Sequence, residues 1–476
     1  MEKNIVSLFR SLIPSVDFCS LRFVDRSEQK LSVRQGIVEP VGNRNSRGAQ
    51  ITVFHNGGAG YAATCDFSRS GLTEAIGRAS SWAEATAGKL HFQPTTPGFP
   101  SAPFPYETQT QQPWHSQDIG EKTERLAQIN TNLKIHDNIV DWWAALYHEQ
   151  TESLFITAET VIQQKFVSLT PFLGAVASNC RETQKRTWGS ESASQAGLEH
   201  LGSMAFAEQA SVTAEDALKL LDARNCPKGR ADLLLMPTQM VLQIHESIGH
   251  PLELDRILGD ERNYAGGSFV TLNMFGHYRY GSDLLNVTFD PTRETQITSY
   301  GFDDEGTASE RAFLIRNGIL ERPIGGHTSQ QRAGLRGVAA SRASDWNRAP
   351  IDRMANINLE PGNSSFASMV ESVEKGILMK TNRSWSIDDS RNKFQFGCEI
   401  GWVIHDGQIR EMIKNPNYRG ISSNFWRNLN AVGEASTFEI LSVSTCGKGE
   451  PNQAVQVGHA TPPCLFGNID IFGSSE

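Results

Sequence analysis

The sequence contains no apolar run of about 18 residues, the length that a membrane-spanning helix needs. It also lacks a disulfide framework, because its seven cysteines are odd in number and form no C-x-x-C pair. The opening residues, MEKNIVSLFRSLIPSVDF, have a broken apolar run and no small-residue cleavage site, so they predict an amphipathic first helix rather than a signal peptide. We therefore expect a cytoplasmic protein with free thiols and no membrane partner.

Long runs of like charge are also missing. The 44 basic and 53 acidic side chains give a net charge of -9 and are spread along the chain. Binding to nucleic acid needs a concentrated basic surface, so we expect no nucleic-acid partner. The length of 476 residues is sufficient for two or three domains, each with its own core.

The first part of the chain has strand signals followed by a helix signal. Residues 18–25, 30–41 and 49–65 are rich in β-branched and aromatic residues at period two, with glycines between them. This pattern predicts a meander of antiparallel strands. From Gly71 to Leu90 the apolar residues recur at helical spacing, which predicts a helix packed on that sheet.

A proline-rich stretch, a helix and a hairpin are expected next. Residues 93–114 contain six prolines and predict an extended strap or linker. A helix is expected to start at a Ser116 cap. The runs IVDWWAALYHEQ and ESLFITAETV are then expected to face each other across a short polar turn, before a helix around residues 194–222.

The polar segment DARNCPKGR, residues 222–230, predicts a domain boundary near residue 226. The second half is richer in glycine, asparagine and short alternating runs, which predicts a mainly β domain. One important helix is expected in it, beginning near Pro237, since proline is tolerated in a first helical turn.

That helix contains the run IHESIGHP, which is one residue longer than the H-E-x-x-H motif of helical zinc sites. Residues four apart differ by about 40° around a helix axis, whereas residues five apart differ by about 140°. His245 and His250 therefore cannot both reach one metal ion from a straight helix. They converge if the helix ends at Gly249 or opens there into a π-type turn.

A catalytic zinc site normally has three protein ligands and one water. The candidates for the third ligand are Cys446, Cys398, Cys464, His277, His327, His405 and His459. Cys446 is favoured because Gly447 and Gly449 allow a tight turn, and because Lys448 is expected to lower the pKa of its thiol. The spacing alone does not decide among them.

The motif HESIGHPLELDR resembles the H-E-x-x-x-H segment of the TldD/PmbA family, and specifically its TldD-like, metal-binding branch. Members of this family are peptidases that were once described as modulators of DNA gyrase. The segments FDDEGTASERAFLIRNGIL, RMANINLEPGN and STCGKGEPNQAVQVGHATP resemble the family in the same order. The segment CGKGEPNQ departs from the usual CGK-x-GQ pattern, which leaves substrate preference and partner open.

The resemblance implies an α+β fold, with an N-terminal domain of helices and antiparallel sheet at residues 1–225. It implies a β-rich C-terminal metallopeptidase domain at residues 226–476, with zinc on His245, His250 and Cys446. Glu246 would be the catalytic residue that takes a proton from a water activated by the metal. The resemblance also implies a homodimer, or a heterodimer with a family member that lacks the motif, acting on peptides or unfolded proteins.

Two other functions stay open at this point. The chain could be a non-catalytic or scaffold subunit of a peptidase dimer, or a zinc-dependent amidase or esterase that uses the same site. The candidate substrate contacts are His327, as a transition-state donor, and Asp303 and Asp304, lining the cleft. Arg353 is a candidate contact for substrate or a partner, with a structural salt bridge as the alternative.

Overall fold

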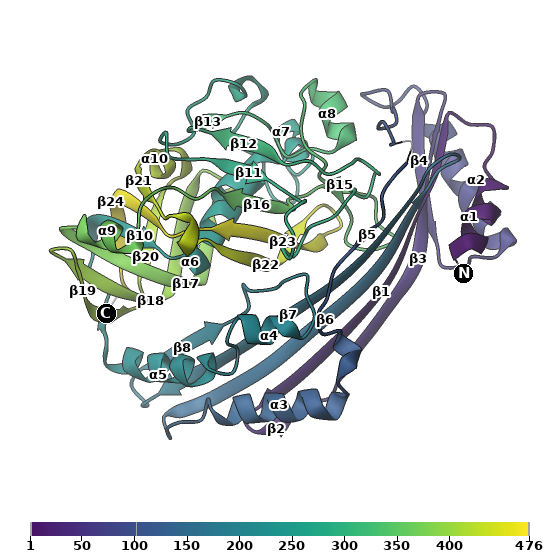
Figure 1. Ribbon diagram of the computed structural model, residues 1–476. Coiled ribbons are helices and arrows are strands. Elements are labelled where there is room, and N and C mark those ends of the chain that lie inside the picture. The colour runs from purple at the N-terminus through teal and green to yellow at the C-terminus, as the bar shows by residue number, and fades with distance from the viewer. Residues whose placement is uncertain (1, 101, 475–476) are drawn as a thin grey trace.

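The computed structural model describes residues 2–100 and 102–474. The fold is α+β, as predicted, with a long antiparallel sheet built by the first half and a β-rich body built by the second half. In Figure 1 the long sheet runs diagonally as a curved layer, and the β-rich body lies on its concave side. No helix among the described residues is long and apolar enough to cross a membrane.

The long sheet has eight strands, and its main order is β4-β3-β1-β6-β7-β5, with β2 on β1 and β8 on β7. Its strands are β1 Phe18–Arg34, β2 Ile37–Val38, β3 Gly42–His55, β4 Gly58–Thr64, β5 Tyr106–Glu107, β6 Ile139–Ile156, β7 Val161–Ser178 and β8 Thr183–Trp188. The proline-rich stretch contributes only the short strand β5, which pairs in parallel with β7. Apart from Trp114, which begins η1 (Trp114–Ser116), its remaining described residues form an irregular strap, as predicted.

The predicted hairpin within residues 139–161 is wrong. The structure has a single strand β6 of 18 residues there, because β7 pairs with it from Ile139 to Ile156. Thr151, which separates the two predicted strands, and nearby Glu149 instead point from this strand into a cavity. A polar pair in the middle of a strand indicates a solvated face as readily as a turn.

Helices flank this sheet at both ends (Figure 1). They are α1 Glu2–Arg10, α2 Arg69–Thr86, η1 Trp114–Ser116, α3 Ile119–Thr131, α4 Glu199–Ser203 and α5 Gln209–Asp222. Helix α3 begins at an Asp118 cap, not at Ser116, because Asp118 and Glu121 form a reciprocal capping box. The predicted helix over residues 194–222 is broken into α4 and α5.

The β-rich body contains two larger sheets. The first has the order β17-β10-β24-β20-β18-β19-β9, with β21 on β24. Its strands are β9 Arg224–Asn225, β10 Gly229–Leu235, β17 Lys375–Ile387, β18 Lys393–His405, β19 Gln408–Lys414, β20 Asn417–Ile421, β21 Leu429–Val432 and β24 Cys464–Phe472.

The second sheet of the body has the order β13-β12-β11-β16-β23-β22, so that β22 lies at its edge. Its strands are β11 Val287–Phe289, β12 Ala312–Arg316, β13 Ile319–Leu320, β16 Asn356–Leu359, β22 Glu439–Lys448 and β23 Gln453–Thr461. A separate two-stranded sheet joins β14 Ser341–Arg342 and β15 Ile351–Asp352.

The helical segments of the body are short. They are α6 Pro237–Ile244, η2 His245–Gly249, η3 His250–Leu252, α7 Leu254–Leu258, η4 Leu272–Met274, α8 His327–Ala333, α9 Phe366–Glu371, α10 Ser422–Arg427 and η5 Ala435–Thr437. Of these, η2 is a π-helical turn that continues α6.

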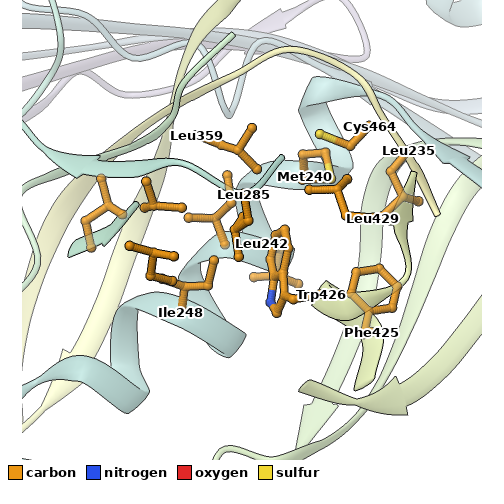
Figure 2. Packing of buried hydrophobic residues seen from close by; sticks show 14 of the residues in the cluster. Leu235, Met240, Leu242, Ile248, Leu285, Leu359, Phe425, Trp426, Leu429 and Cys464 are labelled. Carbon is orange, nitrogen blue, oxygen red and sulfur yellow. The ribbon is translucent and has the colours of Figure 1, made fainter. Parts of the chain in front are cut away.

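The core of the body surrounds α6, whose apolar side chains lie among residues of both sheets and α10 (Figure 2). Met240, Ile244 and Ile248 recur at four-residue spacing and are fully buried, as expected for one face of a helix. Each such side chain contributes about 1.5–3 kcal/mol through burial. Trp426 of α10 donates a hydrogen bond of 2.9 Å to Oγ of Ser247, which links the π-turn to α10. The helix that carries the two histidines is therefore held rigidly.

Candidate metal centre

The two histidines of the HESIGH motif are brought together by the π-helical turn His245–Gly249. The backbone N–H of His250 donates to the carbonyl of His245, which is the hydrogen bond of a π turn. The predicted widening of the helix at Gly249 is thus confirmed. A Cβ atom on Gly249 would lie 2.0 Å from Sδ of Met354, so the turn packs too closely for a side chain at this position.

His245, His250 and Cys446 form a buried cluster. Their ligand atoms lie within 4.8 Å of one another, and the imidazole rings of the two histidines are 4.8 Å apart and nearly perpendicular. Each of the three residues is at most 4% exposed. It is the one group of three or more such residues, in the described part of the chain, that could hold a metal ion.

Both histidines are oriented through their Nδ1 atoms. Nδ1 of His250 donates to the carboxylate of Glu253 at 2.8 Å. Nδ1 of His245 lies 2.9 Å from Nε2 of His459, and Nδ1 of His459 lies 3.0 Å from the carbonyl of Ile357. A carbonyl only accepts, so a neutral His459 donates to Ile357 and accepts from His245. Both histidines are thereby left with a free Nε2 lone pair.

The donor set fits a metal ion. In a tetrahedral site with a thiolate at about 2.3 Å and an imidazole nitrogen at about 2.0–2.1 Å, these two ligand atoms are about 3.5 Å apart. Sγ of Cys446 lies 3.4 Å from Nε2 of His250. Partners on the distal ring nitrogens, such as Glu253, are typical of histidines that bind metal.

The thiol of Cys446 has a lowered pKa. Burial opposes its ionisation, but the electrostatic effects of His250 and Arg353 outweigh burial and lower the pKa. The prediction that Lys448 has this role is wrong. Its ammonium group lies 2.5 Å from Asp255 and 3.5 Å from Glu253, and so supports the carboxylate that orients His250.

Glu246 lies beside the cluster and is paired with Arg391. Nη1 of Arg391 is 2.8 Å from Oε2 of Glu246, and Glu246 is 5% exposed. Burial favours a raised pKa for Glu246, but His250, His245 and Arg391 together hold it below its usual value. The carboxylate is therefore ionised, and among the described residues it makes no hydrogen bond to any of the three cluster residues.

The four candidate substrate residues are not brought to the cluster as a group. Asp303 and Asp304 line a cavity, but Asp303 accepts hydrogen bonds from the backbone N–H groups of Thr307 and Ser341 at 2.9 and 3.1 Å. His327, at the start of α8, lies 3.0 Å from Thr95 of the strap.

Arg353 has a structural place. It is completely buried, and it donates hydrogen bonds to the carbonyls of Cys446 and Gln453, at 2.5 and 2.6 Å. A substrate contact does not fit this position, and neither does the alternative of a salt bridge, because its partners are carbonyl groups. Arg353 instead joins β22 to β23 beside Cys446.

The cavity lies between the long sheet and the β-rich body and has a volume of about 750 Å³. Its floor is formed by alternating side chains of β1, β6 and β7, most of them polar. Ser444 and Thr445, which directly precede Cys446, line it, as does Val455, which pairs with Cys446 across β22 and β23. The cavity therefore reaches the strand that carries the third cluster residue.

Two residues of the centre were not assigned these positions from the sequence. His459 was a candidate ligand, but it contacts Nδ1 of His245 and does not belong to the cluster. Arg391 was not singled out from the sequence. Both reach the centre from strands or turns that are distant in sequence, so no local spacing could have indicated them.

The chain is similar to known metallopeptidases. Residues 228–473 match the family described as PmbA/TldA metallopeptidase C-terminal domain, and residues 19–83 match PmbA/TldA metallopeptidase domain 1. A metalloprotease of Methanothermobacter thermautotrophicus is 26% identical over 470 residues, which cover 98% of both chains. A metalloprotease of Synechocystis sp. is 24% identical and covers 96% of this chain and 95% of its own.

The solved structure of TldE from Thermococcus kodakarensis has the same fold. It superposes with a TM-score of 0.75 and 13% sequence identity, and the match covers 99% of this chain and 100% of that chain. At this identity the likeness concerns the fold alone.

Proposed function

Because the chain belongs to the TldD/PmbA family of metallopeptidases, we propose that it is a zinc-dependent peptidase that hydrolyses small or unfolded peptides. The observation that carries this proposal is the buried cluster of two imidazoles and one thiol beside an ionised glutamate. Zinc is the proposed metal because thiolate and imidazole ligands in a tetrahedral arrangement favour it.

His245, His250 and Cys446 would hold the metal and leave one position open. Zinc bound there would polarise the scissile carbonyl and lower the pKa of a water. A thiolate ligand donates more charge than a carboxylate, which makes the metal a milder Lewis acid and favours slow turnover.

Glu246 would act as the general base and then as the general acid. Its carboxylate takes one proton from the attacking water as the new C–O bond forms, and the π electron pair of the carbonyl moves to its oxygen. When that pair re-forms the carbonyl, the C–N bond breaks and Glu246 returns the proton to the amine. The position of Glu246 next to a ligand, without being one, supports this role.

The substrate would be an extended peptide. The polar cavity between the long sheet and the body offers a place for such a chain, and the edge strand β22 borders it at Ser444 and Thr445. A peptide that pairs with this edge is held through its backbone, with little side-chain selectivity. We propose a cytoplasmic homodimer, or a heterodimer with a relative that lacks the motif; the mass of the complex from its native host distinguishes the two.

The proposal is tested with Glu246→Gln in the full chain. We expect the zinc content, measured by inductively coupled plasma mass spectrometry, to be unchanged. The rate of peptide cleavage should fall about 10²–10⁴-fold. Glu84→Gln, at an exposed position of α2, is the matched control. Cleavage of a peptide library at the wild-type rate by Glu246→Gln would remove the general-base assignment.

The wild-type protein separates the other functions. Zinc-loaded protein that hydrolyses simple amides or esters and no peptide would indicate an amidase or esterase. Protein that binds a family partner but neither zinc nor peptide would indicate a scaffold subunit.

A further inference from the structure

Arg391 lies at the turn between β17 and β18 in a backbone conformation that is unusual for its residue type. Its φ is 61°, in the left-handed region that favours glycine or asparagine. Ten other described non-glycine residues also have a positive φ, so the conformation alone assigns no role, but such residues cluster at active sites and ligand clamps. The side chain of Arg391 reaches the centre and pairs with Glu246 at 2.8 Å.

The turn that carries Arg391 is well supported. The N–H of Arg391 donates to the carbonyl of Asp388 at 2.9 Å, and Ser422 donates to the carbonyl of Arg391 at 3.1 Å. The backbone of Ser390 accepts from Phe269 at 2.8 Å, so the turn is also fixed to the loop after α7. These hydrogen bonds fix the backbone from which the guanidinium of Arg391 extends, and a functional side chain requires such a rigid support.

The guanidinium keeps an unused donor. Its Nη1 donates to Glu246, but its Nε is buried and has no hydrogen-bond partner within the described residues. An unsatisfied buried donor costs about 1–3 kcal/mol, so the hydrogen-bonding capacity of this guanidinium is not filled in this conformation. The side chain of Arg391 is 15% exposed, against 7% for Glu246, so it is the more accessible member of the pair.

Proton transfer changes the charge around Arg391. Before reaction, the positive charge of Arg391 is balanced by the carboxylate of Glu246. As Glu246 takes the proton of the attacking water, this balance is lost, and the negative charge appears on the former carbonyl oxygen of the substrate. A cation beside both groups then attracts the new oxyanion more strongly than it attracted the neutral carbonyl, which is the requirement for catalysis.

We propose that Arg391 is a further catalytic residue, which donates a hydrogen bond to the carbonyl oxygen of the scissile bond as that oxygen becomes negative. This inference rests on the proposed peptidase function. When the carbonyl re-forms and Glu246 gives its proton to the amine, the ion pair between Glu246 and Arg391 is restored.

The test compares wild-type protein with Arg391→Gln and Arg391→Lys, all as full, zinc-loaded chains. Arg410→Gln, at an exposed position of β19, is the matched control. The measurements are zinc content, kcat and KM for the best-cleaved library peptide, and the affinity for that peptide with a phosphinate in place of the scissile amide. The phosphinate carries negative oxygens on a tetrahedral centre and requires no turnover.

We expect Arg391→Gln to keep its zinc, to lower kcat by about 10²–10³-fold and to leave KM within about threefold. Its affinity for the phosphinate peptide should fall at least about tenfold. Arg391→Lys keeps the charge but not the planar guanidinium. Its kcat and its affinity for the phosphinate peptide should lie between those of wild type and of Arg391→Gln. If Arg391→Gln loses zinc, the same comparison is made with Arg391→Lys.

Three results would overturn the inference while peptidase function stands. They are a kcat for Arg391→Gln equal to or above that of wild type, a lower kcat with unchanged affinity for the phosphinate, or a change in KM alone. The second result would mean that Arg391 only orients Glu246. Wild-type protein that cleaves no peptide would remove the proposed function and this inference together.

Discussion

Sγ of Cys446 lies 3.4 Å from Nε2 of His250, although the two residues are 196 positions apart in the chain. Cys446 reaches this position at an irregularity of the edge strand β22, where the pairing with β23 shifts between Val443 and Cys446. His250 reaches it through the π turn. A metal ion on these residues would therefore join a buried helix to a sheet edge, and binding would be coupled to the packing of both.

The contribution of Cys446 can be measured with Cys446→Ala. Loss of the thiolate leaves two imidazoles, so we expect purified protein to lose most of its zinc after dialysis against a weak chelator. Cys464→Ala is the control, because Cys464 is also buried but lies outside the cluster. An unchanged zinc-to-protein ratio in Cys446→Ala would show that the third ligand is a residue other than Cys446.

His459 is predicted to strengthen metal binding by orienting His245. In His459→Phe, Nδ1 of His245 loses its acceptor, and we expect zinc affinity to fall about 10–100-fold. His459→Gln should recover most of the affinity, because its amide can both accept from His245 and donate to Ile357. Competition with a chromophoric chelator measures both variants, and equal affinities for Phe and Gln would contradict the positioning role.

Features of the site that depend on one local element could be predicted from the sequence. The angle between residues five apart on a helix required a break at Gly249, and a π turn is found there. Strand β6 was predicted wrongly, because the continuous pairing with β7, and not its own polar residues, determines its length. Arg391 and Lys448 could not be placed, since each acts across packed elements whose register a single sequence does not show.

Gly249 provides a test of the π turn itself. A Cβ at this position would meet Sδ of Met354 at 2.0 Å, so Gly249→Ala is expected to cost about 1–3 kcal/mol of unfolding free energy. Met354→Ala removes the clash, and the cost of Gly249→Ala should therefore shrink in that background. Urea unfolding of the four zinc-free proteins measures the coupling. Strictly additive costs would show that the contact with Met354 is not the constraint.

The two halves of the molecule are joined by a buried carboxylate. Glu399 of β18 accepts hydrogen bonds from Arg186 at 2.7 Å and from the N–H and hydroxyl of Thr187 at 2.8 Å, both residues of β8. Burial raises the pKa of Glu399 to about 7, in spite of Arg186. The unfolded carboxyl has a pKa of about 4.3.

Stability should therefore depend on pH through Glu399. Between the unfolded and folded pKa values, the folded chain holds a proton that the unfolded chain has lost, so the free energy of unfolding falls as pH rises. Glu399→Gln does not titrate and keeps an acceptor for Thr187. From about pH 5 to about pH 7, zinc-free wild-type protein should lose stability more steeply than Glu399→Gln, by up to about 1.4 kcal/mol per pH unit. Urea unfolding across this range, with Glu84→Gln as the exposed control, measures the difference in slope, and parallel curves would mean that Glu399 is ionised throughout.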